Sequence, residues 1–298
     1  MTAVSGERQT ATTRAEYRIT ELSDPVAIRR LLEPQRDYTA YALAQLDPRM
    51  FPRNRWYLSA GPNSQALLVH SKSPLGSALF ALGDATALDA ALSLHPGPRF
   101  AFGSLMIEHK AIAHKYFLMT RPQVMQRMTV ASDTFRPVDA AAQRLTTSDI
   151  AAVNRLYSTE GGPTAYRTEH LNDAVYCGIF EGRNLISIAG THVVSGAERI
   201  AVVGNVFTHP RYRGQGLAKA TTSAVTQQLL EDCDFVALTV EEKNEPAVAV
   251  YSGLGYETKC KLHETPLVRK EPIGAVSFIR RAIAGWRGRG EGKEIVKK

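Results

Sequence analysis

The sequence contains few cysteines and no long hydrophobic run. Its three cysteines, Cys177, Cys233 and Cys260, are odd in number and far apart, so they offer neither a disulfide framework nor the spacing of a zinc site. No apolar stretch approaches the roughly 20 residues that a transmembrane helix requires. The polar segment 1–13 also lacks the apolar core of a signal peptide. We therefore expect a cytoplasmic protein without a metal, in which residues 1–15 form a disordered leader.

The sequence also lacks a general excess of charge. Apolar residues make up 44% of the chain and charged residues 22%, as in soluble globular proteins. Of the net charge of +7, the segment 270–298 carries +5, from eight Lys and Arg against three Glu. The body of the protein is thus nearly neutral, and we expect no nucleic-acid partner.

The basic tail, residues 269–298, has an amphipathic pattern of its own. Val276, Ile279, Ile283 and Trp286 recur at helical spacing with arginines between them. Such a helix can contact an anionic membrane or another partner, or it can dock on the protein with its charged face outward. The short length of the helix favours docking, and a weak membrane or partner contact remains the alternative.

The most informative segment is a glycine-rich turn, residues 211–218. An apolar strand, residues 200–207, precedes it, and a helical pattern from 216 to about 231 follows it. A strand that leads through glycines into a helix presents unpaired backbone N–H groups at the positive end of the helix dipole, where anions bind. Gly214 and Gly216 allow close approach of a phosphate, and Arg211 and Arg213 can add charge-assisted hydrogen bonds.

A second set of residues follows the turn. A strand at 235–240 leads to Asn244, then Tyr251 seven residues later, then the pair Gly255-Tyr256. Together with Arg211, Gly214 and Gly216, this order resembles the GNAT N-acetyltransferase superfamily, and Gly190-Thr191-His192 and 207–210 resemble its branch of glycine N-acyltransferase-like proteins.

The resemblance implies a binding site for acetyl-CoA and no metal. In the superfamily, the glycine-rich turn holds the pyrophosphate, and the strand before it leaves backbone groups free for the pantetheine arm. Asn244 would hold backbone or the CoA arm, or cap the helix that begins at Pro246. The expected cofactor-binding residues are Val206, Phe207, Thr208, Arg211, Arg213, Gly214, Gln215, Gly216, Leu217, Ala218 and Asn244.

The resemblance also indicates catalytic residues. Tyr251 would donate a proton to the departing thiolate, since a phenol with a pKa near 10 is protonated at neutral pH; a core aromatic role is the alternative. His192 is the first candidate for the base that deprotonates the amine, although a structural role for a histidine in a strand is more common. Glu198 and His209 are weaker candidates. Tyr166-Arg167 could reach an acceptor carboxylate.

The order of patterns predicts an α/β fold. Residues 139–268 would form a catalytic GNAT domain, with a mixed central sheet flanked by helices. Residues 16–138 would form a second, smaller or degenerate GNAT-like α/β unit, as in tandem GNAT proteins. This first half has no glycine-rich turn of the same kind, and the proline-rich loop 94–99 lacks N–H donors, so we expect no CoA there. Its expected strands are 17–20, 66–70, 77–83 and 99–103, and its expected helices are 24–32, 84–94 and 108–117.

The expected function is acetyl-CoA-dependent transfer of an acetyl group to a primary amine of a small metabolite or amino acid, by direct attack in a ternary complex. Two alternatives remain: a non-catalytic acetyl-CoA-binding sensor or scaffold, and a protein or peptide acetyltransferase. The sequence does not identify the acceptor, because substrate pockets lie on variable loops.

Overall fold

The structure is a computed structural model that describes residues 17–73, 76–139, 141–162, 166–172, 174–271 and 275–287. The expected leader and the last part of the tail, residues 288–298, lie outside these ranges. None of the helices within them is long and apolar enough to cross a membrane.

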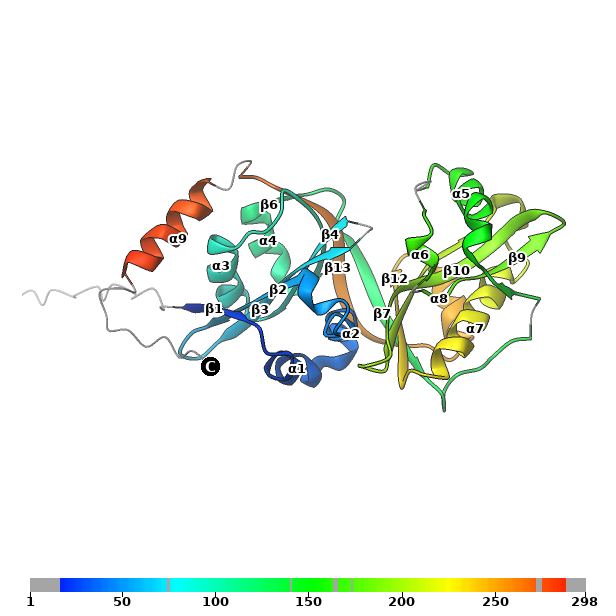
Figure 1. Ribbon diagram of the computed structural model, residues 1–298, viewed down its shortest axis with the longest axis horizontal. Coiled ribbons are helices and arrows are strands. Elements are labelled where there is room, and N and C mark those ends of the chain that lie inside the picture. The colour runs from blue at the N-terminus through cyan, green and yellow to red at the C-terminus, as the bar shows by residue number, and fades with distance from the viewer. Residues whose placement is uncertain are drawn as a thin grey trace, which may run out of the picture.

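The first half begins with a strand and two helices and continues with a sheet (Figure 1). Its elements are β1 (Arg18–Leu22), α1 (Pro25–Leu32), α2 (Arg36–Ala44), β2 (Asn54–Ala60), β3 (Gln65–Ser73), β4 (Gly76–Gly83), α3 (Ala85–Leu94), β5 (Phe100–Met106), α4 (Lys110–Tyr116), β6 (Phe117–Met119) and β7 (Gln123–Ala131).

The second half repeats this order of elements. They are β8 (Gln143–Arg144), α5 (Ile150–Ser158), α6 (Glu169–Asn172), β9 (Cys177–Glu181), β10 (Asn184–Ser195), β11 (Ile200–Thr208), α7 (Leu217–Leu230), β12 (Phe235–Glu241), α8 (Glu245–Ser252), β13 (Glu257–Arg269) and α9 (Ala275–Arg287). The mixed α/β fold and the second α/β unit expected from the sequence are therefore confirmed.

The thirteen strands within the described residues belong to one sheet, and the two halves share its centre. The sheet order is β1-β2-β3-β4-β5-β13-β7-β12-β11-β10-β9-β8, with β6 paired to the end of β13. The last strand of the chain, β13, thus lies between β5 and β7 of the first half, while β7 pairs with β12 of the second. The two parallel pairs, β4 with β5 and β11 with β12, hold the same place in each half.

Apolar side chains of the central strands point alternately to the two faces of the sheet and pack into a core on each face. On one face, α1 and α2 cover a core that includes Trp56, Phe80 and Val202. On the other face of the second half, α7 and α8 cover a core that includes Val225 and Leu238. Because the first core contains residues of both halves, the halves pack as one body.

The tail forms α9, which lies beyond α3 at the end of the first half (Figure 1). The Arg281 guanidinium donates to the carbonyl of Leu94, at the C-terminal end of α3. Val276, Phe278 and Ile279 remain exposed. The helix is thus attached to α3 through an arginine, and these three apolar side chains face solvent.

Candidate active site

The glycine-rich turn has the backbone geometry of an anion site. Gly214 and Gly216 have φ values of 76° and 77°, which other residues adopt only with strain. Both are exposed, and a Cβ at either would meet no atom within 4 Å. Gly216 caps α7 without a side-chain hydrogen bond. In the described part of the chain, no acceptor pairs with the backbone N–H groups of residues 214–219, so this helix end can receive an anion.

The two arginines of the turn differ in their surroundings. Arg213 pairs with Glu160 and donates from Nε to the carbonyl of Thr208 at 3.2 Å. Its guanidinium also lies 5.7 Å from the centre of the Phe207 ring. Arg211 is exposed at the start of the turn. Arg213 therefore fastens the turn to β11 and to the loop after α5, while Arg211 keeps its side chain in solvent.

The strands β11 and β12 separate next to this turn. The two strands pair from Ile200–Phe235 to Val203–Leu238. Beyond these residues β11 continues to Thr208 and β12 to Glu241, but the described strands do not pair with each other there. The edge of β11 that faces away from β10 is thereby left without a strand partner. Val206 and Phe207 are half-buried there.

Strand β11 contains a β-bulge near its unpaired edge. Ile188 pairs with Phe207 and Gly190 with Gly204, so two residues of β11 oppose one of β10. One of the two, Asn205, has a φ of 54°, in the left-handed region that Asn adopts more readily than most residues.

Two tyrosines hold this bulge. The Tyr157 hydroxyl donates to the Asn205 carbonyl at 2.6 Å, and the Asn205 side-chain amide donates to the Tyr176 hydroxyl at 2.8 Å. Burial raises the pKa of both tyrosines. Tyr166 stacks on Tyr157 with ring centres 5.0 Å apart. The tyrosines thus fix the path of β11 beside the separated strands.

Tyr251 lies in α8, in the same apolar cluster as Val203, Leu238 and the half-buried Val206. Its side chain is 8% exposed, and burial raises its pKa to about 12. Its hydroxyl makes no hydrogen bond to a described residue. The oxygen is also not fully buried, so it keeps contact with solvent. It is thus a protonated donor beside the point where the strands part.

Asn244 begins α8. Its side-chain oxygen accepts from the Ala247 N–H at 3.3 Å, and Pro246 occupies the first turn. Asn244 is therefore a helix cap, which was one of its two expected roles.

His192 lies on β10, over the bulged part of β11. Its ring occupies the space that a Cβ at Gly204 would fill, so only glycine at 204 permits this position. The side chain is exposed to solvent but surrounded by protein. These surroundings lower its pKa, while a hydrogen bond with Asn205 acts in the opposite direction. A lowered pKa keeps more of the imidazole neutral, which is the form that accepts a proton.

The weaker candidates lie elsewhere or have structural partners. Glu198 lies in the turn between β10 and β11, at the other end of β11 from the bulge, and pairs with Arg29. The His209 ring accepts from the Arg211 N–H at 3.2 Å. Arg167 is exposed just before α6. The structure thus does not bring Glu198 to the site, and it gives His209 a capping role.

Three polar residues that lie close to one another were not expected from the sequence. They come from elements that cross between the halves: Arg127 of β7, Glu264 of β13 and Tyr41 of α2. The Arg127 side chain is 2% exposed, and its Nη2 lies 3.9 Å from Glu264 Oε1. Burial raises the pKa of Glu264 and lowers that of His192; the charge of Arg127 opposes the first shift and adds to the second. Sequence analysis missed Arg127 and Glu264 because their strands alternate polar and apolar residues like many others, and it missed Tyr41 because it did not predict α2.

The turn of the first half that matches the glycine-rich turn is Gly83-Asp84, which leads from β4 into α3. The proline-rich loop 94–99, which the sequence analysis compared with it, follows α3 instead. In the matching turn, the Asp84 carboxylate accepts from Thr86 and Ala87 N–H groups at 2.8 and 3.0 Å. A carboxylate already occupies the anion position, which supports the prediction of no CoA in the first half for a different reason from the one expected.

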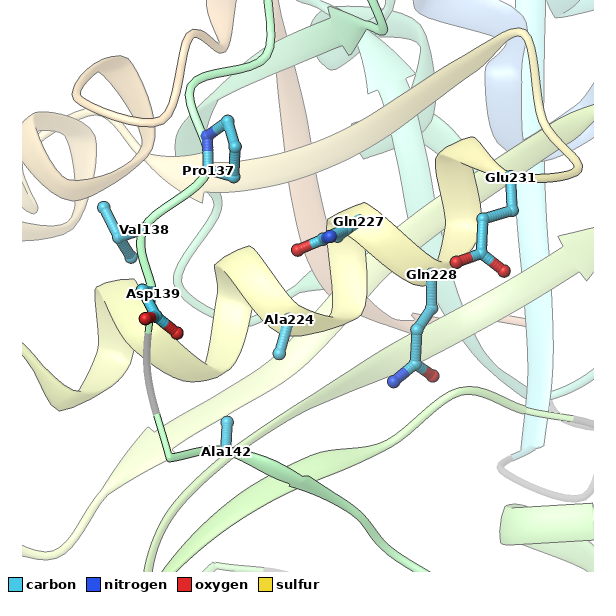
Figure 2. A pocket seen from close by; sticks show the side chains of 8 residues that line it. All are labelled: Pro137, Val138, Asp139, Ala142, Ala224, Gln227, Gln228 and Glu231. Atoms are coloured by element: carbon cyan, nitrogen blue, oxygen red, sulfur yellow. The ribbon is translucent and has the colours of Figure 1, made fainter.

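An open pocket lies along one face of α7 (Figure 2). It is bordered by the segment after β7 and by one face of the helix, and Asp139 and Glu231 make it acidic. Its lining is Pro137, Val138, Asp139, Ala142, Ala224, Gln227, Gln228 and Glu231. Without a cation, this lining does not suit a pyrophosphate. Among the described residues, no group of His, Cys, Asp and Glu is placed to hold a metal ion.

Residues 144–256, which include the turn, the separated strands and Tyr251, match the model of the acetyltransferase (GNAT) family. The second half of the chain therefore carries a GNAT domain. The GNAT fold supports acyl transfer from an acyl-CoA to an acceptor. No curated protein matches the chain in sequence.

Solved structures agree with the GNAT fold. A protein from Drosophila has a TM-score of 0.61 at 13% identity, over 84% of this chain and 98% of its own. A GNAT-family protein from Novosphingobium aromaticivorans has a TM-score of 0.50 at 19% identity, over 64% and 84%. A GCN5-related N-acetyltransferase from Kribbella flavida also has a TM-score of 0.50, at 17% identity over 69% and 86%. At these identities the likeness concerns the fold alone.

Proposed function

We propose that this protein transfers an acetyl group from acetyl-CoA to a primary amine of a small molecule. The observation that carries the proposal is the row of N–H groups at residues 214–219, which pair with no acceptor in the described residues and lie beside the separated strands. The turn would bind the pyrophosphate, and the free edge of β11 at residues 206–208 would pair with the pantetheine arm. The exposed Arg211 would add a charge-assisted bond to a phosphate.

In this mechanism His192 would accept a proton from the amine through water, and a free β11 N–H would polarise the thioester carbonyl. Tyr251 would stabilise the departing sulfur by hydrogen bonding. Full proton transfer from a phenol with a pKa of about 12 to a thiolate is unfavourable, because a thiol is the stronger acid. We therefore assign Tyr251 the role of hydrogen-bond donor, with solvent completing protonation of CoA.

The test is release of free CoA from acetyl-CoA by the full chain against a library of small amines, with a peptide library as a second arm. Turnover of small amines supports the proposal. Binding of acetyl-CoA without turnover of any acceptor would instead indicate a sensor or scaffold, and turnover of peptides alone would indicate a protein acetyltransferase.

A further inference from the structure

Arg127 is a buried cation without adequate partners. Its guanidinium Nε and Nη1 are both buried and form no hydrogen bond within the described ranges. Its third nitrogen lies 3.9 Å from Glu264, beyond the distance of a direct hydrogen bond. An arginine keeps its charge in any environment, and a buried charge without partners is strongly unfavourable. Such a group therefore calls for a ligand that the chain itself does not supply.

The position of Arg127 points to the acceptor side of the proposed site. It is in register with Thr239 of β12 and Cys260 of β13, at the centre of the shared sheet. Burial raises the pKa of Tyr41 of α2, and the nearby charge of Arg127 opposes this rise. Burial lowers the pKa of His192 of β10, and the charge of Arg127 lowers it further. Arg127 thus faces the region between α2, β13 and β10, in which His192 is the expected base.

Arg127 itself is buried, but residues near it reach solvent. His192 is exposed, Tyr41 is half-buried, and the Glu264 side chain is 19% exposed. Burial raises the pKa of Glu264, whereas Arg127 and a hydrogen bond from Thr239 lower it. The Glu264 carboxylate thus accepts a hydrogen bond from Thr239 and makes none with Arg127. Nε and Nη1 of Arg127 can therefore bind another anion.

We propose that Arg127 binds the carboxylate of the acceptor, so that the substrates are amines that also carry a carboxylate, such as amino acids. This inference rests on the proposed function and adds the acceptor class and the residue that selects it. A guanidinium pairs with a carboxylate through two parallel N–H bonds, and Nε together with Nη1 or Nη2 can supply such a pair. Arg127, from the shared strand β7, would hold the carboxylate, while His192 would face the amine.

The kinetic test compares acceptors that differ by one carboxylate, such as alanine and ethylamine, in CoA release by the full chain. We expect the wild type to prefer the carboxylated acceptor. In Arg127→Met, kcat/KM for that acceptor should fall about 10- to 100-fold, mainly through KM, with the amine little affected. Arg127→Lys should retain part of the preference. Equal use of both acceptors by the wild type, or an equal loss for both in Arg127→Met, would overturn the proposal.

A binding test separates this inference from the proposed function. Acetate should raise the Tm of the wild type and of Glu264→Gln, which keeps Arg127 and removes a competing carboxylate, but not that of Arg127→Met. Circular dichroism and acetyl-CoA binding would verify that the variants fold. A shift in the wild type without turnover of any amine would refute the enzyme and retain the carboxylate site. A shift that Arg127→Met also shows would refute the role of Arg127.

Discussion

The Tyr157 hydroxyl of α5 donates a 2.6 Å hydrogen bond to the backbone carbonyl of Asn205, the bulge residue of β11. This single bond connects the helix next to the tyrosine cluster with the strand edge that is expected to bind the pantetheine arm. The bulge residue has a φ of 54°, so the bend depends on contacts that hold it in the left-handed region.

We expect Tyr157→Phe to lower the free energy of unfolding by about 1–3 kcal/mol, because the Asn205 carbonyl loses its partner. The KM for acetyl-CoA should rise as well, since the free edge of β11 becomes less fixed. Urea unfolding and CoA-release kinetics would measure the two effects. Tyr38→Phe, which removes a similar buried bond to the Ala81 carbonyl in the first half, is the matched control. It should lose stability without a change in KM, and an equal change in KM for both would refute the role of the bulge.

The glycine-rich turn gives a second prediction. Gly214→Val and Gly216→Val should raise the Kd for acetyl-CoA at least about 10-fold, because both positions need a positive φ and lie open to an approaching phosphate. Calorimetric titration would measure Kd.

The control for this turn is Gly76→Val in the first half, where φ is 124° and a Cβ would also meet no atom within 4 Å. Backbone strain of at least about 1–2 kcal/mol should destabilise all three variants. Unchanged acetyl-CoA binding in both turn variants would contradict the assignment of the pyrophosphate site.

This turn was predictable from the sequence, and the acceptor side was not. The strand, the two glycines and the start of α7 are local features of residues 200–231. The helix expected at 84–94 is a local feature in the same way. The positions of Arg127 and Glu264 depend instead on β13 inserting between β5 and β7, a pairing between segments more than 100 residues apart. Likewise, α2 buries Tyr38, Thr39 and Ala40 in succession, so it has no clear amphipathic period and the sequence did not indicate it.

The first half should show a pH-dependent stability that originates at His70. Burial lowers the pKa of His70 from 6.5 to about 4, although its Nε2–H donates to the His95 carbonyl at 2.8 Å. The unfolded chain therefore binds this proton more readily than the native state does. The stability contributed by neutral His70 is complete above pH 6.5, and it is lost as the pH falls towards 4, by up to about 3 kcal/mol.

Urea unfolding at pH 7.5 and pH 4.5 would measure this loss. His70→Gln cannot titrate in this range but can still donate to the carbonyl, so its stability should change less between the two pH values. His114→Gln, at an exposed position, is the control and should follow the wild type. If His70→Gln lost as much stability as the wild type between these pH values, His70 would not be the source.

Tyr251 gives the prediction that bears most directly on chemistry. Tyr251→Phe should lower kcat about 10- to 100-fold, since a hydrogen bond to a charged group contributes about 1.5–3 kcal/mol, and it should leave the Kd for acetyl-CoA unchanged. With a pKa of about 12, the wild-type hydroxyl stays protonated through neutral pH, so it should add no descending limb to the kcat profile below about pH 11. The neighbouring Tyr256, whose hydroxyl lies 2.7 Å from that of Thr226, supplies the control: Tyr256→Phe should lose stability but keep its kcat. If Tyr251→Phe kept full turnover with the same acceptor, its role as donor would be wrong, while acetyl transfer itself would stand.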